Sequence, residues 1–492
     1  MGSSELPFPP GDYDVVVVGS GPGGLQTAYF LERLSVPHAV LSADDAPGGM
    51  FRKWPIFQRL LSWSKPEAPF GRDTREYEWY DHNSLLAEES GLRGLVPEFM
   101  DRSWAVPSRV EMEQGLAAFA DRAGVAVRYG CRWQSTRREE DGRLVLGTTD
   151  GEYRCRAAVF ALGVTEPWRS PIPGIEEVPH YAETGEPASY AGKSVVVIGK
   201  RNSGFEIADG LLPWARKITL VSPRPAETSV IALASIRVRY LQPLEDRALG
   251  GGTYVLDAAI ERIERTSTGF LVVANGTTHQ AGYELDCDAA LAATGFTTPL
   301  GDLGGLGVRT VAQGRIPALT PHFEAAGAPG VFFAGNATQG AAGLRKRGVG
   351  ASSPAVHGFR YNAKVLAEHL AERLGVRDRP RRPLAREEVV PFLAGELARA
   401  PELWAQKGYL CRVVGLDGPS DDGIQPLEHF VDASGGDAVA VAVEMDAGGT
   451  IYPGVYVRQE GRIREVELEP HPLNEFDREP YRRELATLVG EP

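Results

Sequence analysis

Asp14-Val15-Val16-Val17-Val18, followed directly by Gly19-Ser20-Gly21-Pro22-Gly23-Gly24, is the stretch that decides the fold. The short apolar run predicts a buried parallel strand. Residues 25–34 then have helical periodicity, and residues 38–41 predict a second strand. A strand, a glycine-rich turn and a helix in this order form the unit that binds a dinucleotide. The sequence therefore predicts a βαβ nucleotide site near its start.

The residues of this turn have separate roles. Gly19 permits the tight turn, Gly21 lets the backbone approach a pyrophosphate, and Gly24 lets the helix pack closely against the strand. Pro22 and Gly23 begin the helix, whose unpaired N–H groups and positive dipole end favour phosphate. We expect all five residues to contact the nucleotide.

The acid that usually holds the ribose hydroxyls is missing from its normal place. It should end the second strand, where this sequence has Ser42. Asp44 and Asp45 stand slightly further along, and either could take over this role. The alternative is that both are ordinary loop acids.

A second unit of the same kind begins at residue 193. The apolar run 193–198 leads into Gly199-Lys200-Arg201-Asn202-Ser203-Gly204 and a helix, and a further strand is expected at 218–221. Two such units in one chain are far more specific than one. They indicate a flavoprotein that binds FAD at the first unit and NAD(P)H at the second. The residues expected at the second nucleotide are Gly199, Asn202, Ser203 and Gly204.

The second motif is irregular, because Arg201 occupies the position of the middle glycine. Either Lys200 and Arg201 contact phosphate directly, or this unit binds nucleotide poorly. Arg224 follows the strand end where a cation would meet the 2′-phosphate of NADPH. It therefore favours NADPH over NADH. The alternative is a surface arginine in a proline-rich turn.

Further strands are expected to complete the FAD domain around the second unit. Residues 157–162 and 289–293 predict the two chain crossings between the domains, and Thr294 and Gly295 follow the second crossing. Residues 331–333 predict a last strand. Gly335 and Asn336 follow it and are expected at the ribityl chain and pyrophosphate of the flavin, because an amide can hydrogen-bond a ribityl hydroxyl.

The predicted fold class is α/β, with two Rossmann-like domains, the NAD(P)H domain inserted into the FAD domain, and a small C-terminal α+β extension. The expected boundaries are 12–165 and 290–376 for the FAD domain, 166–289 for the NAD(P)H domain and 384–492 for the extension. The extension is expected to contain a helix at 387–400 and strands at 438–444, 451–457 and 463–468. It carries no recognised catalytic motif, and three roles stay open for it: covering the active site, supporting a homo-oligomer interface, or stabilising the core.

Composition excludes several classes of protein. The chain of 492 residues has 52 Lys and Arg against 65 Asp and Glu, a formal charge of −13, which argues against nucleic-acid binding. Its four cysteines include no CxxC pair and no metal-ligand spacing. No stretch approaches the ~20 apolar residues that span a bilayer, and the first residues do not resemble a signal peptide. The expected location is the cytoplasm, with no membrane and no metal involved.

The chain resembles the flavin-containing monooxygenase superfamily, and within it the ERFAD-like group of FAD-dependent oxidoreductase-domain proteins and their bacterial relatives. The resemblance covers roughly residues 12–370. It rests on the two glycine motifs, on Ala293-Thr294-Gly295-Phe296, and on more specific matches. Those matches are Phe51, Trp54-Pro55, Leu60-Leu61-Ser62-Trp63-Ser64-Lys65, Asp81 with Asn83-Ser84-Leu85-Leu86, Asn202-Ser203-Gly204-Phe205-Glu206 and His357-Gly358-Phe359-Arg360-Tyr361.

The resemblance implies a reaction cycle in which NADPH reduces FAD, oxygen forms a C4a-(hydro)peroxyflavin, and one oxygen atom passes to a small polar substrate, as in N-hydroxylation of an amine or amino acid. The Baeyer–Villiger fingerprint is absent, and His180-Tyr181 is only a faint echo of it. Two alternatives stay open: an oxidoreductase or oxidase without oxygen transfer, and a flavoprotein that acts mainly as a binding partner.

Five residues are candidates for the catalytic pocket. The resemblance favours Lys65 as a partly buried cation beside flavin or substrate; the alternative is a surface lysine on an amphipathic stretch. Asp81 and Asn83 are expected to line the same pocket. Arg345 and Lys346 lie in a glycine-rich loop and are expected to bind a substrate carboxylate or a nucleotide phosphate; the alternative is an exposed loop.

Overall fold

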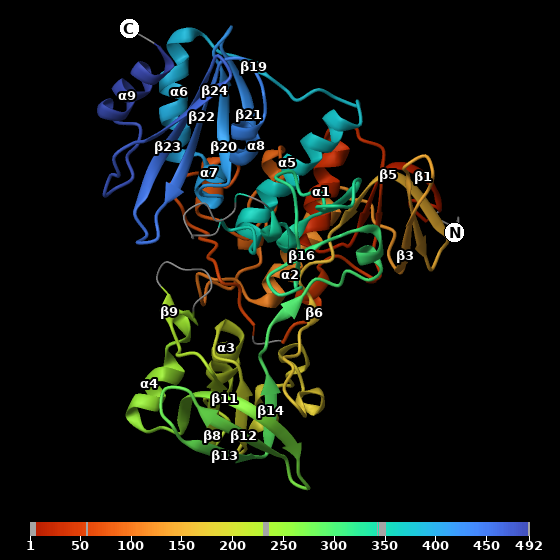
Figure 1. Ribbon diagram of the computed structural model, residues 1–492, viewed down its shortest axis with the longest axis vertical. Coiled ribbons are helices and arrows are strands. Elements are labelled where there is room, and N and C mark those ends of the chain that lie inside the picture. The colour runs from red at the N-terminus through yellow and green to blue at the C-terminus, as the bar shows by residue number, and fades with distance from the viewer. Residues whose placement is uncertain (1–5, 56–57, 230–235, 342, 344–350, 491–492) are drawn as a thin grey trace.

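The protein is described here from a computed structural model, which describes residues 6–55, 58–229, 236–341, 343 and 351–490. The described residues form three lobes, each built on a six-stranded sheet. The first lobe lies in the middle of Figure 1, the second below it and the third, made from the C-terminal residues, above it. The first lobe is therefore in contact with both of the others.

The first sheet has a parallel core extended by an antiparallel hairpin. Its order is β2-β1-β5-β4-β3, and β18 pairs with the free part of β5. Its strands are β1 (Gly11–Val18), β2 (His38–Leu41), β3 (Trp133–Arg138), β4 (Leu144–Thr148), β5 (Glu152–Phe160) and β18 (Val331–Phe333). Helices α1 (Pro22–Arg33), α2 (Arg109–Arg122) and α5 (Val356–Arg373) pack around it. The four valines of β1 are buried, as the apolar run predicts.

The second sheet repeats this plan. Its order is β13-β12-β11-β8-β7-β14, in which β14, β7, β8 and β11 are parallel and β11, β12 and β13 are antiparallel. Its strands are β7 (Ser194–Ile198), β8 (Lys217–Ser222), β11 (Thr253–Arg265), β12 (Phe270–Gly276), β13 (Gly282–Cys287) and β14 (Ala289–Ala292). The lobe also contains α3 (Asn202–Leu211), α4 (Gln242–Leu249), β9 (Thr228–Ser229) and β10 (Ile236–Arg237).

The chain passes between these two lobes twice, and the two crossings pair with each other. Strand β6 (Glu166–Pro167) is antiparallel to β15 (Phe296–Thr297). In Figure 1 the two crossings run side by side between the lobes. The small pair β16 (Thr310–Val311) and β17 (Ile316–Pro317) follows.

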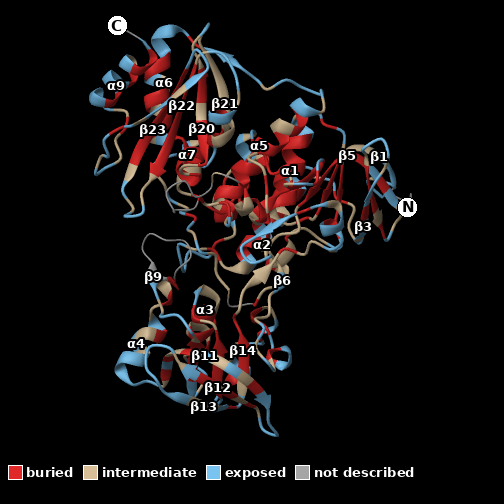
Figure 2. Ribbon diagram, viewed as in Figure 1, coloured by how far each residue is buried: buried red, intermediate tan, exposed pale blue. Residues whose placement is uncertain are grey.

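The third lobe is an antiparallel sheet with helices packed against it. Its order is β19-β21-β20-β22-β23-β24. The strands are β19 (Arg382–Pro383), β20 (Leu410–Gly415), β21 (Ser420–Pro426), β22 (Ala438–Met445), β23 (Ile451–Gln459) and β24 (Arg462–Glu467), and the helices are α6 (Arg386–Arg399), α7 (Pro401–Ala405), α8 (Leu427–Asp432) and α9 (Glu479–Val489). Figure 2 shows that β20, β22 and β23 are buried while α9 exposes one face. This lobe has its own apolar core.

A buried ionic cluster joins the third lobe to the first. Arg75 of the first lobe donates to Glu396 Oε1 at 2.9 Å and to Glu402 Oε2 at 2.7 Å, and Arg412 donates to Glu396 at 2.8 Å. Although burial opposes it, the Arg75 and Arg412 guanidiniums lower the pKa of Glu402 to about 2. Because removing one member of such a cluster leaves a buried charge uncompensated, the cluster fixes how the two lobes meet.

The predicted fold class is confirmed. The two parallel cores and the order in which the chain visits them agree with the expected insertion of one Rossmann-like unit into another. The first crossing strand differs in position, since β5 occupies Glu152–Phe160 rather than 157–162. The hairpin strands β11–β13 and the strands β20 and β21 were not predicted. Among the described residues, no helix combines the length and apolar character needed to cross a membrane.

Candidate active site

The first glycine turn is closed by two contacts that leave no room for a side chain. Gly19 has φ +118°, and a Cβ built on it would lie 2.5 Å from the carbonyl oxygen of Ala161. A Cβ on Gly24 would lie 1.9 Å from the carbonyl oxygen of Gly19. A Cβ on Gly23 would lie 2.5 Å from Gly335 Cα, so the turn also packs directly against the segment that follows β18. These positions need glycine for packing, whatever the turn binds.

The second turn has the same construction. Gly199 has φ +120°, and its Cβ would lie 2.4 Å from the carbonyl oxygen of Ala293. A Cβ on Gly204 would lie 2.2 Å from the carbonyl oxygen of Gly199. Thus each turn passes under the residue that follows a neighbouring parallel strand, and each helix approaches its own turn equally closely.

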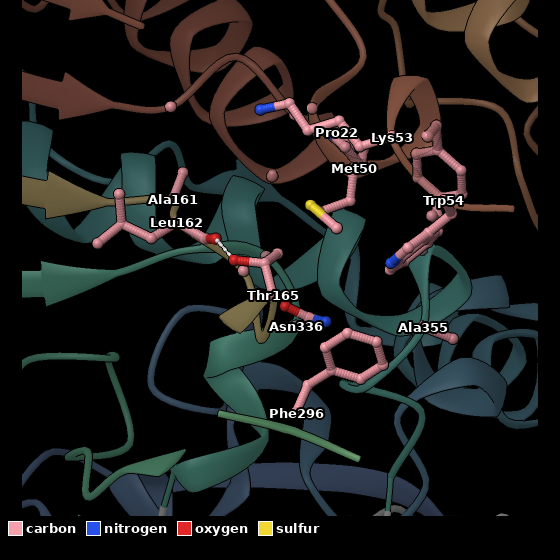
Figure 3. Close-up of a pocket in the computed structure, with 18 of the residues that line it drawn as sticks. Pro22, Met50, Lys53, Trp54, Ala161, Leu162, Thr165, Phe296, Asn336 and Ala355 are labelled. Atoms are coloured by element: carbon pink, nitrogen blue, oxygen red, sulfur yellow. Dashed lines mark hydrogen bonds between the residues drawn. The ribbon is translucent and has the colours of Figure 1, made fainter. Parts of the chain in front are cut away.

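One cavity of about 550 Å³ connects the first turn with the start of α3, and neither Gly199 nor Gly204 lines it. It begins at Gly19–Gly23 of the first lobe and reaches Asn202 and Ser203, the first two residues of α3 in the second. In Figure 3, Pro22 and Met50 lie on one side, Asn336 on another, and the ring of Phe296, from β15, closes the space below. We call this the nucleotide cavity. A single space therefore touches both predicted nucleotide motifs.

The first turn offers a fitting cradle for a pyrophosphate. The nearest atom to a Cβ on Gly21 would be Gly49 Cα at 3.9 Å, so this position faces the cavity rather than packed protein. Asn336 accepts a hydrogen bond from Val164 N–H at 2.9 Å through Oδ1, which leaves its NH₂ group to donate. Gly335 and Asn336 line the cavity, and Figure 3 shows the Asn336 side chain beside Thr165. These residues fit FAD.

The structure separates the three polar residues after β2. Ser42 is buried and its hydroxyl is 2.8 Å from that of Ser20. Asp44 lines the cavity and pairs with Lys53 at 2.5 Å. The Asp45 side chain is 85% exposed, pairs with Arg52 and is not part of the lining. Of the two acids, only Asp44 is placed to meet a ribose in this cavity.

The second turn presents a different set of charges. The Lys200 ammonium donates to the carbonyl of Leu256 at 2.7 Å and forms an ion pair with Asp257, so it is turned away from the turn's mouth. Arg201 is exposed and has extended backbone, which accommodates a side chain without strain. Arg224 is also exposed, two residues beyond the end of β8. Of the two cations in the motif, Lys200 is therefore held by protein groups, whereas Arg201 is exposed and does not line the nucleotide cavity.

Sequence reasoning missed a buried acid between the lobes. Glu206, on α3, lines the nucleotide cavity and accepts hydrogen bonds from the hydroxyls of Tyr181, at 2.6 Å, and Tyr240. Burial raises its pKa. Arg239 lies 3.7 Å from the same carboxylate and donates to the carbonyls of Arg59, at 2.7 Å, and Leu60. The second lobe is thereby attached to the first at the cavity wall. Glu206 belongs to the Asn202–Glu206 segment on which the family resemblance rests. Its role in joining the lobes becomes visible only through its distant partners Tyr181 and Arg239.

The crossing residues Thr294 and Gly295 have a structural position. Thr294 donates to the carbonyl of Trp168, and the Gly295 carbonyl lies 2.9 Å from His180 Nε2. Neither residue lines the nucleotide cavity, although the next residue, Phe296, does. They hold the two chain crossings together, and this places Phe296.

A buried arginine organises the segment that contains Asp81 and Asn83. Arg360 of α5 is 1% exposed and donates to the carbonyls of Asp81 at 2.9 Å, Ser84 at 2.8 Å and Glu78 at 3.0 Å. The Asp81 carboxylate accepts from Asn83 N–H at 3.0 Å and from the Ser64 hydroxyl. Asn83 lines the nucleotide cavity, whereas Asp81 does not. Asp81 thus supports the wall of the cavity. Arg360, whose role was not predicted, holds the backbone of this segment at Asp81 and Ser84.

Lys65 differs from the expectation. Its side chain is exposed and lies over the rings of Trp63, at 5.6 Å, and Tyr80, at 5.8 Å, outside the nucleotide cavity. The amphipathic stretch turns it to solvent, as in the alternative interpretation. Arg345 and Lys346 lie outside the described residues.

The four cysteines are all free and buried, and none lines the nucleotide cavity. Burial raises the pKa of each thiol. They therefore have the character of core residues rather than of a reactive dithiol.

Comparisons with known proteins agree on the frame of this site. Residues 16–335 match the family described as "Pyridine nucleotide-disulphide oxidoreductase". FAD-dependent oxidoreductase domain-containing protein 2 of Danio rerio is 25% identical over 415 residues, which are 73% of this chain and 59% of the relative. The matched part thus spans less than two thirds of that relative's length.

Two further similarities cover nearly the whole of the matched protein. A ferredoxin–NADP reductase of Salinispora tropica is 29% identical over 373 residues, covering 73% of this chain and 96% of the reductase. The solved structure of a flavin-containing monooxygenase from Stenotrophomonas maltophilia has a TM-score of 0.56 and 22% identity, covering 74% of this chain and 99% of that one. At this identity the second similarity concerns the fold.

Proposed function

From the premise that this chain belongs to the pyridine nucleotide-disulphide oxidoreductase family, we propose that it is an FAD- and NADPH-dependent monooxygenase acting on a small organic substrate. The resemblance to two-domain flavoproteins that the sequence indicates is confirmed by the family match and by the fold. Oxidoreductase chemistry with a flavin is the common property of this frame.

One observation carries the proposal: a single cavity joins the first glycine turn to the start of α3, at Asn202 and Ser203 of the second motif. A flavin held at Gly21 and a nucleotide held at the first turn of α3 would share this space, so their reacting rings can meet without crossing protein. Tyr181, Glu206 and Tyr240 line this cavity. The Glu206 carboxylate accepts hydrogen bonds from both hydroxyls and lies 3.7 Å from Arg239, so its charge has a partner within the protein.

The chain's own residues bind and orient. Gly19, Gly21 and Gly24 would shape the pyrophosphate cradle, Asp44 would meet the ribose, and the NH₂ group of Asn336 would donate to the ribityl chain. When bound, the flavin supplies hydride acceptance and the reaction with oxygen. Arg201 and Arg224 are the cations for the phosphates of NADPH.

The cysteines favour this chemistry over disulphide reduction. Disulphide reductases need a reactive thiol pair beside the flavin, whereas all four thiols of this chain are buried away from the cavity. A second candidate is a reductase that passes electrons to a separate acceptor without oxygen transfer. The similarity to ferredoxin–NADP reductases over 96% of one such enzyme favours it.

The test is rapid mixing of the FAD-loaded protein with NADPH without oxygen, followed by oxygenated buffer. Bleaching of the visible flavin band by NADPH is expected for both candidates. With substrate present, a monooxygenase incorporates labelled oxygen from O₂ into product and releases little peroxide. A reductase would give no labelled product, although NADPH would bleach its flavin equally well. Failure of NADPH to bleach the flavin would contradict both candidate functions.

A further inference from the structure

A second cavity of about 410 Å³ adjoins the nucleotide cavity. The two share Leu61, Ser62, Pro354 and Ala355 in their linings, so they are separated by one layer of residues at most. The remaining lining comes from the first lobe and, in the third lobe, from α7 and Lys407. These residues are Trp63, Trp79, His82, Ser352, His357, Pro401, Trp404 and Lys407.

The walls of this second cavity are aromatic and flat. His82 stacks on His357 with ring centroids 3.6 Å apart and planes at 17°, and Trp63 lies 4.7 Å from His82. Trp79 lies 4.8 Å from Trp404, across the contact between the lobes. Burial lowers the pKa of His82 to about 3 and that of His357 well below its usual value, so both rings are neutral near pH 7.

Among the described residues of this lining, Lys407 is the single formal charge near neutral pH. Its ammonium donates to the carbonyl of Trp404 at 2.5 Å and lies 5.3 Å from the centre of that ring. No carboxylate pairs with it among the residues that the structure describes, and the lining contains no Asp or Glu. Burial lowers its pKa to about 8. A half-buried ammonium with donors to spare is a site for an anion.

We propose that the second cavity is the substrate chamber and that it takes a planar aromatic carboxylate, with the ring against Trp63, Trp404 and the histidines and the carboxylate on Lys407. This rests on the proposed function, since the chamber adjoins the space assigned to the flavin. An amine substrate, which the family resemblance favours, finds no carboxylate among the described residues of this lining. The volume suits a bicyclic ring system, because pockets for small ligands begin at about 300 Å³.

The test uses the oxidised FAD-loaded enzyme, with 2-naphthoate as the probe and 2-naphthamide as its neutral counterpart. Isothermal titration should show naphthoate binding at least about 10-fold more tightly than naphthamide, because a charge-assisted hydrogen bond is lost with the amide. Lys407→Met should remove this preference and leave naphthamide binding unchanged. Lys193→Met is the matched control, because Lys193 also lies over an aromatic ring, that of Tyr190, in the second lobe.

A pH series provides a second readout that does not depend on the variant. Naphthoate binding to the unchanged enzyme should weaken as the pH rises through about 8, where Lys407 loses its proton, while naphthamide binding stays flat. Equal binding of the two probes, or equal naphthoate binding by Lys407→Met, overturns the proposal. No step here needs NADPH, so flavin that NADPH cannot bleach would count against the proposed function alone.

Discussion

The first and second glycine turns of this protein have the same backbone construction and differ at the middle position of the motif. In both, a Cβ built on the first glycine would lie too close to a neighbouring carbonyl oxygen, at 2.5 Å for Gly19 and 2.4 Å for Gly199, and a Cβ on the last glycine would collide with the carbonyl of the first. Between them, the first turn has Gly21, which faces open space, and the second has the exposed Arg201.

This difference separates what the fold requires from what the ligand requires. The outer glycines are fixed by the contact between strand and helix, which any βαβ unit of this kind must make. The middle position is free of this packing constraint, because a Cβ on Gly21 would have no protein atom nearer than 3.9 Å and Arg201 is exposed. A glycine there suits a pyrophosphate pressed permanently on the backbone, whereas an arginine suits a phosphate that arrives, is held by charge and leaves.

The largest effect is expected from a side chain at the first turn. Gly21→Val should lower FAD affinity about 100-fold or more, because the side chain would fill the pyrophosphate cradle. The protein should still fold, since the nearest atom to a Cβ is 3.9 Å away. The ratio of flavin to protein absorbance after purification measures this. Gly304→Val is the control, with nothing within 4 Å of its Cβ. A Gly21→Val protein that purifies yellow, and so retains FAD, would show that the first turn does not bind the pyrophosphate of FAD.

The next effect concerns which nucleotide the second turn selects. Arg224→Ala should raise the KM for NADPH about 10-fold or more, because the 2′-phosphate loses a charged partner. The KM for NADH should stay nearly constant. Steady-state kinetics with both nucleotides decide this, and equal changes would mean that Arg224 is only a surface residue.

A smaller effect is expected from making the second turn like the first. Arg201→Gly should weaken both NADPH and NADH about 5-fold, since an exposed charged contact contributes about 1 kcal/mol. Arg201→Lys should retain most of the affinity. Tighter binding by Arg201→Gly would show instead that the arginine crowds the pyrophosphate, and the two turns would then bind in the same way.

The smallest effect is the stabilisation by the transient ligand. NADP⁺ at ten times its Kd contributes about 1.4 kcal/mol and should raise the Tm by at most about 3 °C. Removal of FAD should lower the Tm several times more, because FAD is held far above its Kd. Scanning fluorimetry of the holoprotein, the apoprotein and the NADP⁺ complex measures both. Equal shifts would erase the distinction between a permanent and a transient site.

The sequence predicts the frame of the molecule because its signals are local. Apolar runs followed by glycine turns locate β1, α1, β7 and α3 within a few residues. Strand β11 was missed because its 13 residues are partly exposed and show no continuous apolar run. The added strands of the third lobe lack a motif that would distinguish them from loops.

The site was predicted less completely, since side chains acquire roles through distant partners. Asn83 and Asp44 line the nucleotide cavity as expected. Lys65 does not, because its stretch turns the ammonium to solvent. Arg360 contacts carbonyls that lie more than 270 residues earlier in the chain, and Lys407 faces a cavity made by two lobes. No spacing along one chain encodes such contacts.

The contact between the first and third lobes brings together cavity-lining residues from distant segments of the chain. The cradle and the crossing strands are encoded before residue 341, whereas two walls of the second cavity, Trp404 and Lys407, come from a short stretch of the third lobe. On the proposed assignment, part of the substrate selectivity and the electron delivery thus lie on separate segments of the chain. Selection, or a protein engineer, can therefore retune the ligand through residues 401–407 while the redox core stays as it is.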